Sequence, residues 1–251
     1  MCIHCHRFYK TRDLKPDEHR CEEVKCGNCT QFVPIKDHQC YMLKKDIKPH
    51  SENYMFFDFE TKLDRLTNKH VVNYCIVHDF NGTENIFTCI GDVCKWAFVK
   101  KHKGYTFVVH YGKGYDFQFI AEWLIDNGVK PHIIHNGQKI IQVKFDYNIR
   151  FIDSISFTLM PLRDFPKTFG LKELAKGYFP HKFNTDDNQD YVGQYTHKMY
   201  YGYDEMKKAD RERFDEWYAT TEGKTFDIKL QMYHYCKSDV DILRRGCLKL
   251  R

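Results

Sequence analysis

Residues 54–61 read Tyr54-Met-Phe-Phe-Asp-Phe-Glu-Thr61 and predict an apolar β-strand that ends in two carboxylates. Side chains two positions apart on a strand share a face, so Asp58 and Glu60 project together. Two like charges on a buried strand repel each other and lose hydration, and they therefore need cations or protons beside them. The simpler alternative, in which the strand has ended and both carboxylates are solvated, fits this stretch equally well when it is taken alone.

Two more carboxylates lie at informative places later in the chain. Asp116, in Gly114-Tyr-Asp-Phe-Gln-Phe119, begins a predicted helix, where an aspartate is often a purely local N-cap. Asp239 follows Tyr235 by one turn of the last predicted helix and falls within its apolar stripe, which consists of Ile228, Met232, Tyr235, Asp239 and Ile242. Clustered with the strand pair, these side chains are the oxygen ligands that two divalent ions, roughly 3.5–4 Å apart, need for phosphodiester hydrolysis.

The composition allows one substantial domain and a small appendage. The chain has 251 residues, of which 42% are hydrophobic, and its formal net charge is +5. A slightly basic, densely charged surface fits a nucleic-acid enzyme without being diagnostic of one. No stretch approaches the roughly 18 apolar residues of a membrane span, and the start, Met-Cys-Ile-His-Cys, has no apolar signal core. We therefore expect no membrane partner.

The first 40 residues contain the pattern Cys-x2-Cys…His-x-Cys twice, which predicts two tetrahedral Cys3His zinc sites of the closed, structural type. The predicted ligands are Cys2, Cys5, His19 and Cys21 for one ion and Cys26, Cys29, His38 and Cys40 for the other. A cross-braced arrangement, in which the two Cys-x2-Cys pairs share an ion, stays open, and His4 and His6 are spare donors for the first site. Thiolates on metal indicate a reducing compartment, so we expect an intracellular protein, with the nucleus as one location.

The domain organisation follows from the change in texture along the chain. Residues 1–40 are the zinc units, residues 41–52 form a polar linker, and residues 53–251 read as one α/β domain. The predicted strands are Asn53–Glu60, Val71–His78, Asn85–Ile90, Tyr105–Val109, Ile133–His135, Ile140–Phe145 and Ile149–Ile152, and the predicted helices are Asp92–Lys101, Tyr115–Asp126, Asp210–Ala219 and Asp227–Leu250. Between them, residues 161–203 are rich in Tyr, Pro and Gly and predict an irregular insertion.

The three carboxylate motifs resemble those of the proofreading 3′→5′ exonuclease domain of family B DNA polymerases, a member of the DEDDy exonucleases with an RNase H-like fold. The closest resemblance is to the protein-primed branch, which includes bacteriophage, linear-plasmid and Polinton/Maverick transposon polymerases. Thr158-Leu-Met-Pro-Leu162 resembles the single-stranded-DNA motif of that branch, and Lys176-Gly-Tyr-Phe179 resembles its lysine motif. Altogether the resemblance covers about residues 53–251.

The resemblance implies a role in DNA replication, with Asp58, Glu60, Asp116 and Asp239 as ligands of two Mg²⁺ or Mn²⁺ ions. Tyr235 would orient the attacking water, and Lys176 would neutralise charge on the scissile phosphate. The expected substrate is a single-stranded DNA 3′ end, contacted by Thr158 and Leu159 and stacked on Tyr115 and Phe117. An RNA-directed DEDDy nuclease is a further alternative, and DNA is preferred only on the strength of the resemblance.

Two features depart from the family pattern. The second motif has Asn where this chain has Tyr111, and that asparagine helps to hold the substrate strand, so we expect Tyr111 to weaken the grip. The sequence also contains no Tyr-x-Asp-Thr-Asp or Ser-Leu-Tyr-Pro segment of a polymerase palm. We therefore expect a fragment, a partial gene product or a freestanding exonuclease module, with a polymerase domain on a longer parent chain as one partner. A catalytically inactive, zinc-dependent DNA-binding module is the rival hypothesis.

Overall fold

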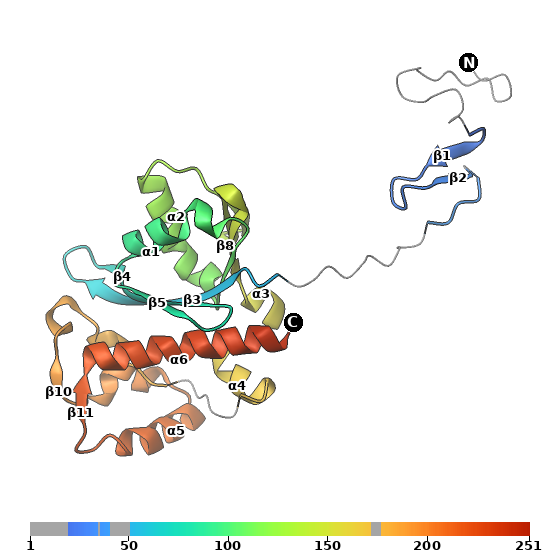
Figure 1. Cartoon of the computed structure of the whole chain (residues 1–251). Helices are drawn as coiled ribbons and strands as arrows, with labels where there is room; N and C mark the ends of the chain where they lie inside the picture. The colour runs from blue at the N-terminus through green and yellow to red at the C-terminus, as the bar shows by residue number, and fades with distance from the viewer. Residues whose placement is uncertain (1–19, 35, 41–50, 172–176) are drawn as a thin grey trace. The chain divides into compact units, whose positions relative to one another are not determined.

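The computed structural model describes residues 20–34, 36–40, 51–171 and 177–251 (Figure 1). The chain divides into two compact units, Met1–His50 and Ser51–Arg251. In the first unit, β1 (Glu23–Lys25) pairs antiparallel with β2 (Phe32–Pro34) as a short hairpin.

The second unit is built on a seven-stranded mixed sheet with the strand order β5-β4-β3-β6-β9-β8-β7. The central strand β3 pairs antiparallel with β4 and parallel with β6, and β6 pairs parallel with β9. The remaining neighbours are antiparallel. The strands are β3 (Tyr54–Asp64), β4 (Lys69–Asp79), β5 (Glu84–Phe87), β6 (Thr106–Val109), β7 (His132–Asn136), β8 (Lys139–Phe145) and β9 (Ile149–Asp153).

Helices cover both faces of this sheet (Figure 1). Helices α1 (Ile90–Ala97) and α2 (Asp116–Asp126) pack on one face and bury the larger apolar cluster. The long helix α6 (Ile228–Lys249) packs on the other face together with α4 (Phe165–Thr168). Helix α6 begins where it does because the Asp227 carboxylate accepts hydrogen bonds from the backbone N–H groups of Lys229 and Leu230.

The alternation of side chains along β3 decides which layer receives the carboxylates. Met55, Phe57 and Phe59 point into the cluster beneath α1 and α2, whereas Phe56 points into the cluster beneath α6. Asp58 and Glu60 have the same parity as Phe56 and therefore face the α6 layer.

In its described residues, the predicted insertion at 161–203 is largely irregular and contains α4 and β10 (Val192–Gln194). Strand β10 pairs antiparallel with β11 (Thr225–Asp227), which lies beyond the insertion. The short helix α3 (Ile155–Thr158) precedes the insertion, and the predicted helix Asp210–Ala219 is observed as α5 (Lys208–Ala219). Short 3-10 turns make up much of the rest of the second unit: η2 (Lys100–His102), η3 (Gly112–Gly114), η4 (Asp146–Asn148), η5 (Leu162–Asp164), η6 (His181–Phe183), η7 (Asp186–Asn188), η8 (Lys198–Tyr201) and η9 (Tyr203–Glu205). The segment Asn85–Ile90, expected to be wholly strand, divides because Ile90 already belongs to α1.

The close approach of α6 to α4 generates a stability prediction. A Cβ added at Gly246 would lie 2.3 Å from Cδ2 of Phe165, whose ring is 0% exposed and has no room to move. We expect Gly246→Ala to lower the free energy of unfolding by about 1–3 kcal/mol through overpacking, despite the better helix propensity of alanine.

Urea denaturation measures this effect, and Gly91→Ala in α1 is the matched control. A Cβ at Gly91 meets its nearest neighbour, Trp123 Nε1, at 3.6 Å, which is an ordinary contact. The control should be neutral or stabilising. Wild-type stability for Gly246→Ala would contradict the close packing of α6 against α4.

Candidate active site and metal-binding clusters

The site begins with the carboxylate pair on β3. Ligand atoms of Asp58, Glu60 and the Cys236 thiol all lie within 4.8 Å of one another. Glu60 is 3% exposed, and the strand register shifts immediately after it, between Glu60 and Thr61. The alternative in which both carboxylates are solvated at a strand end is therefore wrong for Glu60.

Helix α6 brings Asp239 to the same region. Asp239 is 2% exposed, and it lines one cavity together with Asp58, His110 and residues 159–163. One turn earlier on α6, the Cys236 Sγ lies 3.6 Å from the Asp58 carbonyl oxygen, to which it donates. Two segments that are 181 positions apart in sequence therefore contribute carboxylates to one cavity wall.

Asp116 is the first residue of α2, whose N-cap is Tyr115, so the purely local capping role is not the one observed. The side chain is 4% exposed. Burial, together with the charge of the nearby Asp153, raises the pKa of Asp116 to about 7. Burial also raises the pKa of the Cys75 thiol, with added contributions from the charges of Asp58 and Asp116. Asp58 and Asp116 are thus both close enough to Cys75 to act on its thiol. A cation near these two carboxylates would favour their charged forms.

A buried aspartate that the sequence reasoning did not single out holds the loop before α2. Asp153 ends β9 and is 1% exposed. One carboxylate oxygen accepts from the N–H groups of Tyr111 and Ile155 at 2.9 and 3.0 Å, and the other accepts from Lys113 at 2.9 Å. An aspartate directly after a buried strand and before a Ser is a signal for such backbone capping, and it could have been found.

The loop itself has an unusual backbone. Tyr111 has φ 68° and ψ 18°, in the left-handed region that glycine and asparagine favour. This conformation costs a bulky L-residue about 1–2 kcal/mol. The hydrogen bond from its N–H to Asp153 helps to hold it there.

A second cavity is lined by Glu60, and its walls also include Tyr115, His181 and Asn184. The Tyr115 hydroxyl lies 2.6 Å from Thr61 Oγ1. His181 Nδ1 is 3.6 Å from a Glu60 carboxylate oxygen. The buried Asn184 side chain donates to the Thr61 carbonyl at 2.8 Å and so ties the insertion to β3 next to the bulge.

The Tyr235 ring contacts two rings of the insertion, with centroid distances of 5.6 Å to Phe179 and 5.2 Å to His181. His181 also contacts Glu60, so Tyr235 is near the carboxylate pair. Lys176, predicted to touch the scissile phosphate, lies outside the described residues.

Two of the predicted DNA contacts need correction. Phe117 is 0% exposed in the core beneath α2 and has no accessible face for a base. Its spacing with Ile120 and Leu124 is that of a core stripe, which the sequence reasoning missed. Thr158 is 7% exposed and its hydroxyl donates to the Ser154 carbonyl at 2.8 Å, so it holds a turn. Leu159 beside it is 83% exposed, with φ 49°.

The first unit brings together the four side chains that sequential pairing assigns to one zinc ion: Cys26, Cys29, His38 and Cys40. Cys26 Sγ is 3.5 Å from Cys40 Sγ, and Cys29 Sγ is 3.7 Å from His38 Nε2. Hydrogen bonds from the backbone of Cys29 and Asn28 lower the pKa of Cys26 to about 6. Three thiols and an imidazole fit a tetrahedral zinc ion. Of the other set, Cys21 is exposed, and Cys2, Cys5 and His19 lie outside the described residues.

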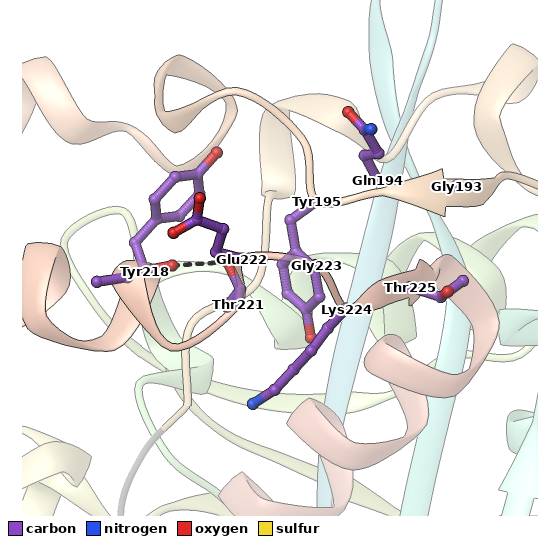
Figure 2. Close-up of a pocket in the computed structure, with 10 residues that line it drawn as sticks. Gly193, Gln194, Tyr195, Tyr218, Thr221, Glu222, Gly223, Lys224 and Thr225 are labelled. Carbon is purple, nitrogen blue, oxygen red and sulfur yellow. Dashed lines mark hydrogen bonds between the residues drawn. The ribbon is translucent and has the colours of Figure 1, made fainter.

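A further cavity is lined by none of the predicted site residues (Figure 2). It is lined by β10, β11 and the end of α5, with Tyr195, Tyr218 and Lys224 among its side chains. Within the described ranges, no helix is both long and apolar enough to cross a membrane.

Sequence comparison places the chain in a family. The family of type B DNA polymerases of organellar and viral origin matches residues 98–251, which is more than half of the chain. The chain therefore belongs to this family, and the resemblance found in its motifs is confirmed. No curated protein matches the sequence.

Solved structures support the same fold. Phi29 DNA polymerase in complex with primer-template DNA and incoming nucleotides shares 16% identity over 79% of this chain, with a TM-score of 0.51. The complex of the same enzyme with single-stranded DNA shares 16% identity over 80% of the chain, with a TM-score of 0.51. The match covers 31% of each polymerase chain. At this identity the likeness shows the fold alone, and it confirms the expected α/β exonuclease-domain fold.

The Cys26 cluster generates a metal-binding prediction. Cys26→Ala or Cys40→Ala should reduce bound zinc by about one ion per chain, because each removes a ligand of one tetrahedral set. Elemental analysis of the purified protein measures the zinc content. Cys89→Ala is the control, since Cys89 is an exposed cysteine of the second unit. Unchanged zinc in both cluster variants would show that these four side chains hold no ion.

Proposed function

We propose that residues 53–251 form a metal-dependent 3′→5′ DNA exonuclease, the proofreading module of a protein-primed type B DNA polymerase. One observation carries the proposal. The carboxylates Asp58 and Glu60 from the central strand and Asp239 from α6 are brought to one side of the sheet, with Glu60 and Asp239 almost fully buried. Buried, clustered carboxylates without a cation would repel one another, so the arrangement favours a metal centre.

The four carboxylates Asp58, Glu60, Asp116 and Asp239 would hold two Mg²⁺ or Mn²⁺ ions. Bound divalent ions of this kind activate water and neutralise charge on a phosphodiester. Regular secondary structure would hold these ligands in fixed positions. Asp58 and Glu60 belong to strand β3, whereas Asp116 and Asp239 belong to helices α2 and α6, which pack on opposite faces of the sheet. Oxygen donors of this type match hard cations.

Tyr235 would act as an orienting hydrogen-bond donor for the attacking water. Its ring packs against both Phe179 and His181, which favours a fixed orientation. Lys176 would neutralise phosphate charge beside it, as the family motif implies.

The substrate strand would enter along the cavity that contains Asp58 and Asp239. Leu159 and Tyr111 are exposed on its wall, and Tyr115 lines the second cavity together with Glu60. The matched polymerase structures contain single-stranded or primer-template DNA. We infer the same class of ligand here, and a polymerase domain on a longer parent chain as the functional partner.

For residues 1–40 we propose two structural zinc units, joined by a linker at residues 41–52 to the exonuclease domain. The Cys26 cluster supports the second unit directly. A segment of this size has too small a core to fold alone, so zinc would supply most of its folding free energy.

The proposal predicts that the full chain shortens 5′-labelled single-stranded DNA from the 3′ end with Mg²⁺ or Mn²⁺ and not with chelator. Asp58→Ala/Glu60→Ala should lower the rate at least about 1,000-fold, because loss of two ligands removes several kcal/mol of transition-state stabilisation. Glu212→Ala/Glu216→Ala on the exposed face of α5 is the matched control and should leave the rate unchanged.

Tyr235→Phe should be milder, because it removes one orienting hydrogen bond and leaves the ligands in place. Gel analysis of the product ladder gives rate and polarity together. If wild-type protein binds single-stranded DNA but leaves it intact with either metal, the inactive DNA-binding module is the correct description.

A further inference from the structure

Tyr111 combines a left-handed backbone conformation with a bulky side chain that disfavours this conformation. Its left-handed conformation suits asparagine, yet the chain carries a large aromatic ring there. Strained residues of this kind persist where the surroundings hold them, and they cluster at functional sites. Asp153 accepts the Tyr111 N–H at 2.9 Å, and glycines at 112 and 114 flank the turn.

The Tyr111 ring is fixed along one edge and is still accessible to solvent. A Cβ at Gly114 would lie 2.6 Å from Cε1 and 3.0 Å from Cδ1 of Tyr111, so one edge of the ring fills the space that this glycine leaves. The side chain as a whole is still 54% exposed. A ring that is held at one edge and is more than half exposed is suited to stack on a base.

The ring also lies on the wall of the cavity that contains two of the proposed metal ligands, Asp58 and Asp239. Leu159, on the same wall, is likewise exposed and left-handed, with φ 49°. Two large apolar side chains are thus held out toward the cavity by backbones that such residues seldom adopt. Exposed apolar groups beside a charged site mark a ligand surface.

We propose that the Tyr111 ring stacks on an unpaired base at the 3′ end of the substrate strand. The inference rests on the proposed exonuclease function and specifies how that site recognises its substrate. In the sequence alone, Tyr111 counted as the loss of an asparagine that holds the strand. By this proposal, a stacking contact between the Tyr111 ring and a base replaces the hydrogen bond that an asparagine amide would make to the strand.

This exchange changes what the site recognises. Stacking requires a base but tolerates any base, because all four have a π face. An amide contact to the strand itself would be indifferent to removal of the base. Recognition by Tyr111 therefore depends on base presence at the 3′ end, and it favours unpaired over base-paired ends, because a paired base is already stacked in its duplex.

Binding of the full chain to fluorescent single-stranded oligonucleotides in chelator tests the proposal without any need for hydrolysis. One oligonucleotide has ordinary 3′-terminal nucleotides, and its partner has abasic residues at the last two positions. Wild-type protein and Tyr111→Phe should bind the abasic strand about 5- to 150-fold more weakly than the ordinary one. Tyr111→Asn and Tyr111→Ala should lose this discrimination and bind the ordinary strand more weakly than wild type.

Tyr147→Asn is the matched control. Tyr147 is also left-handed, with φ 60°, and its side chain is 46% exposed, but it lies in the turn between β8 and β9 and does not line the cavity. The control receives the same substitution and the same relief of backbone strain. It should keep the wild-type discrimination.

Three results would overturn the proposal: equal wild-type affinity for both strands, no measurable binding of either, or discrimination that survives in Tyr111→Asn. If Tyr111→Asn bound the ordinary strand more tightly than wild type, Tyr111 would only mark the loss of an asparagine contact to the strand, and the stacking proposal would be wrong. These experiments measure binding and do not depend on hydrolysis. A protein that discriminates against abasic ends but hydrolyses no DNA would therefore contradict the exonuclease proposal and support the stacking proposal.

Discussion

A carboxylate pair on the central strand β3, with Asp58 half-buried and Glu60 buried, is the constraint on which the rest of the second unit depends. Strand β3 pairs parallel with β6 at Tyr54–Phe56 and antiparallel with β4 through Asp58 and Glu60, so the β4 ladder holds the backbone of the two carboxylates in place. Their shared parity with Phe56 directs both toward α6. Every neighbouring element must accommodate negative charge in a largely dry layer, and this is a condition that divalent cations satisfy well.

The elements around the pair are held by polar contacts that reach across the sequence. Asp153 fixes the loop before α2 by accepting three backbone N–H groups. Asn184 fixes the far end of the pair by donating to the Thr61 carbonyl. These buried polar side chains are fully used in hydrogen bonds, so they restrict the geometry of the site at little cost in desolvation. Rigid supports of this kind are what a site needs to keep ligands within a fraction of an ångström.

Much of this arrangement was predictable from the sequence, for identifiable reasons. The run Met55–Phe59 marks the central strand, and the stripe on the last helix places Asp239 inward, because strong local periodicity survives tertiary packing. The left-handed Tyr111 was not predictable, because its conformation is imposed by Asp153 from a strand 42 positions away. Phe117 was misplaced because its closeness to Asp116 in sequence was given more weight than the helical spacing that turns it into the core.

The central claim is that the four carboxylates form one two-metal centre. Anomalous diffraction from crystals of the full chain grown with Mn²⁺ and a deoxynucleoside monophosphate tests it most directly. The account predicts two manganese peaks roughly 3.5–4 Å apart, with Asp58, Glu60, Asp116 and Asp239 all contributing oxygen ligands. Carboxylates without manganese, or an Asp239 whose oxygens contact neither ion, would contradict it.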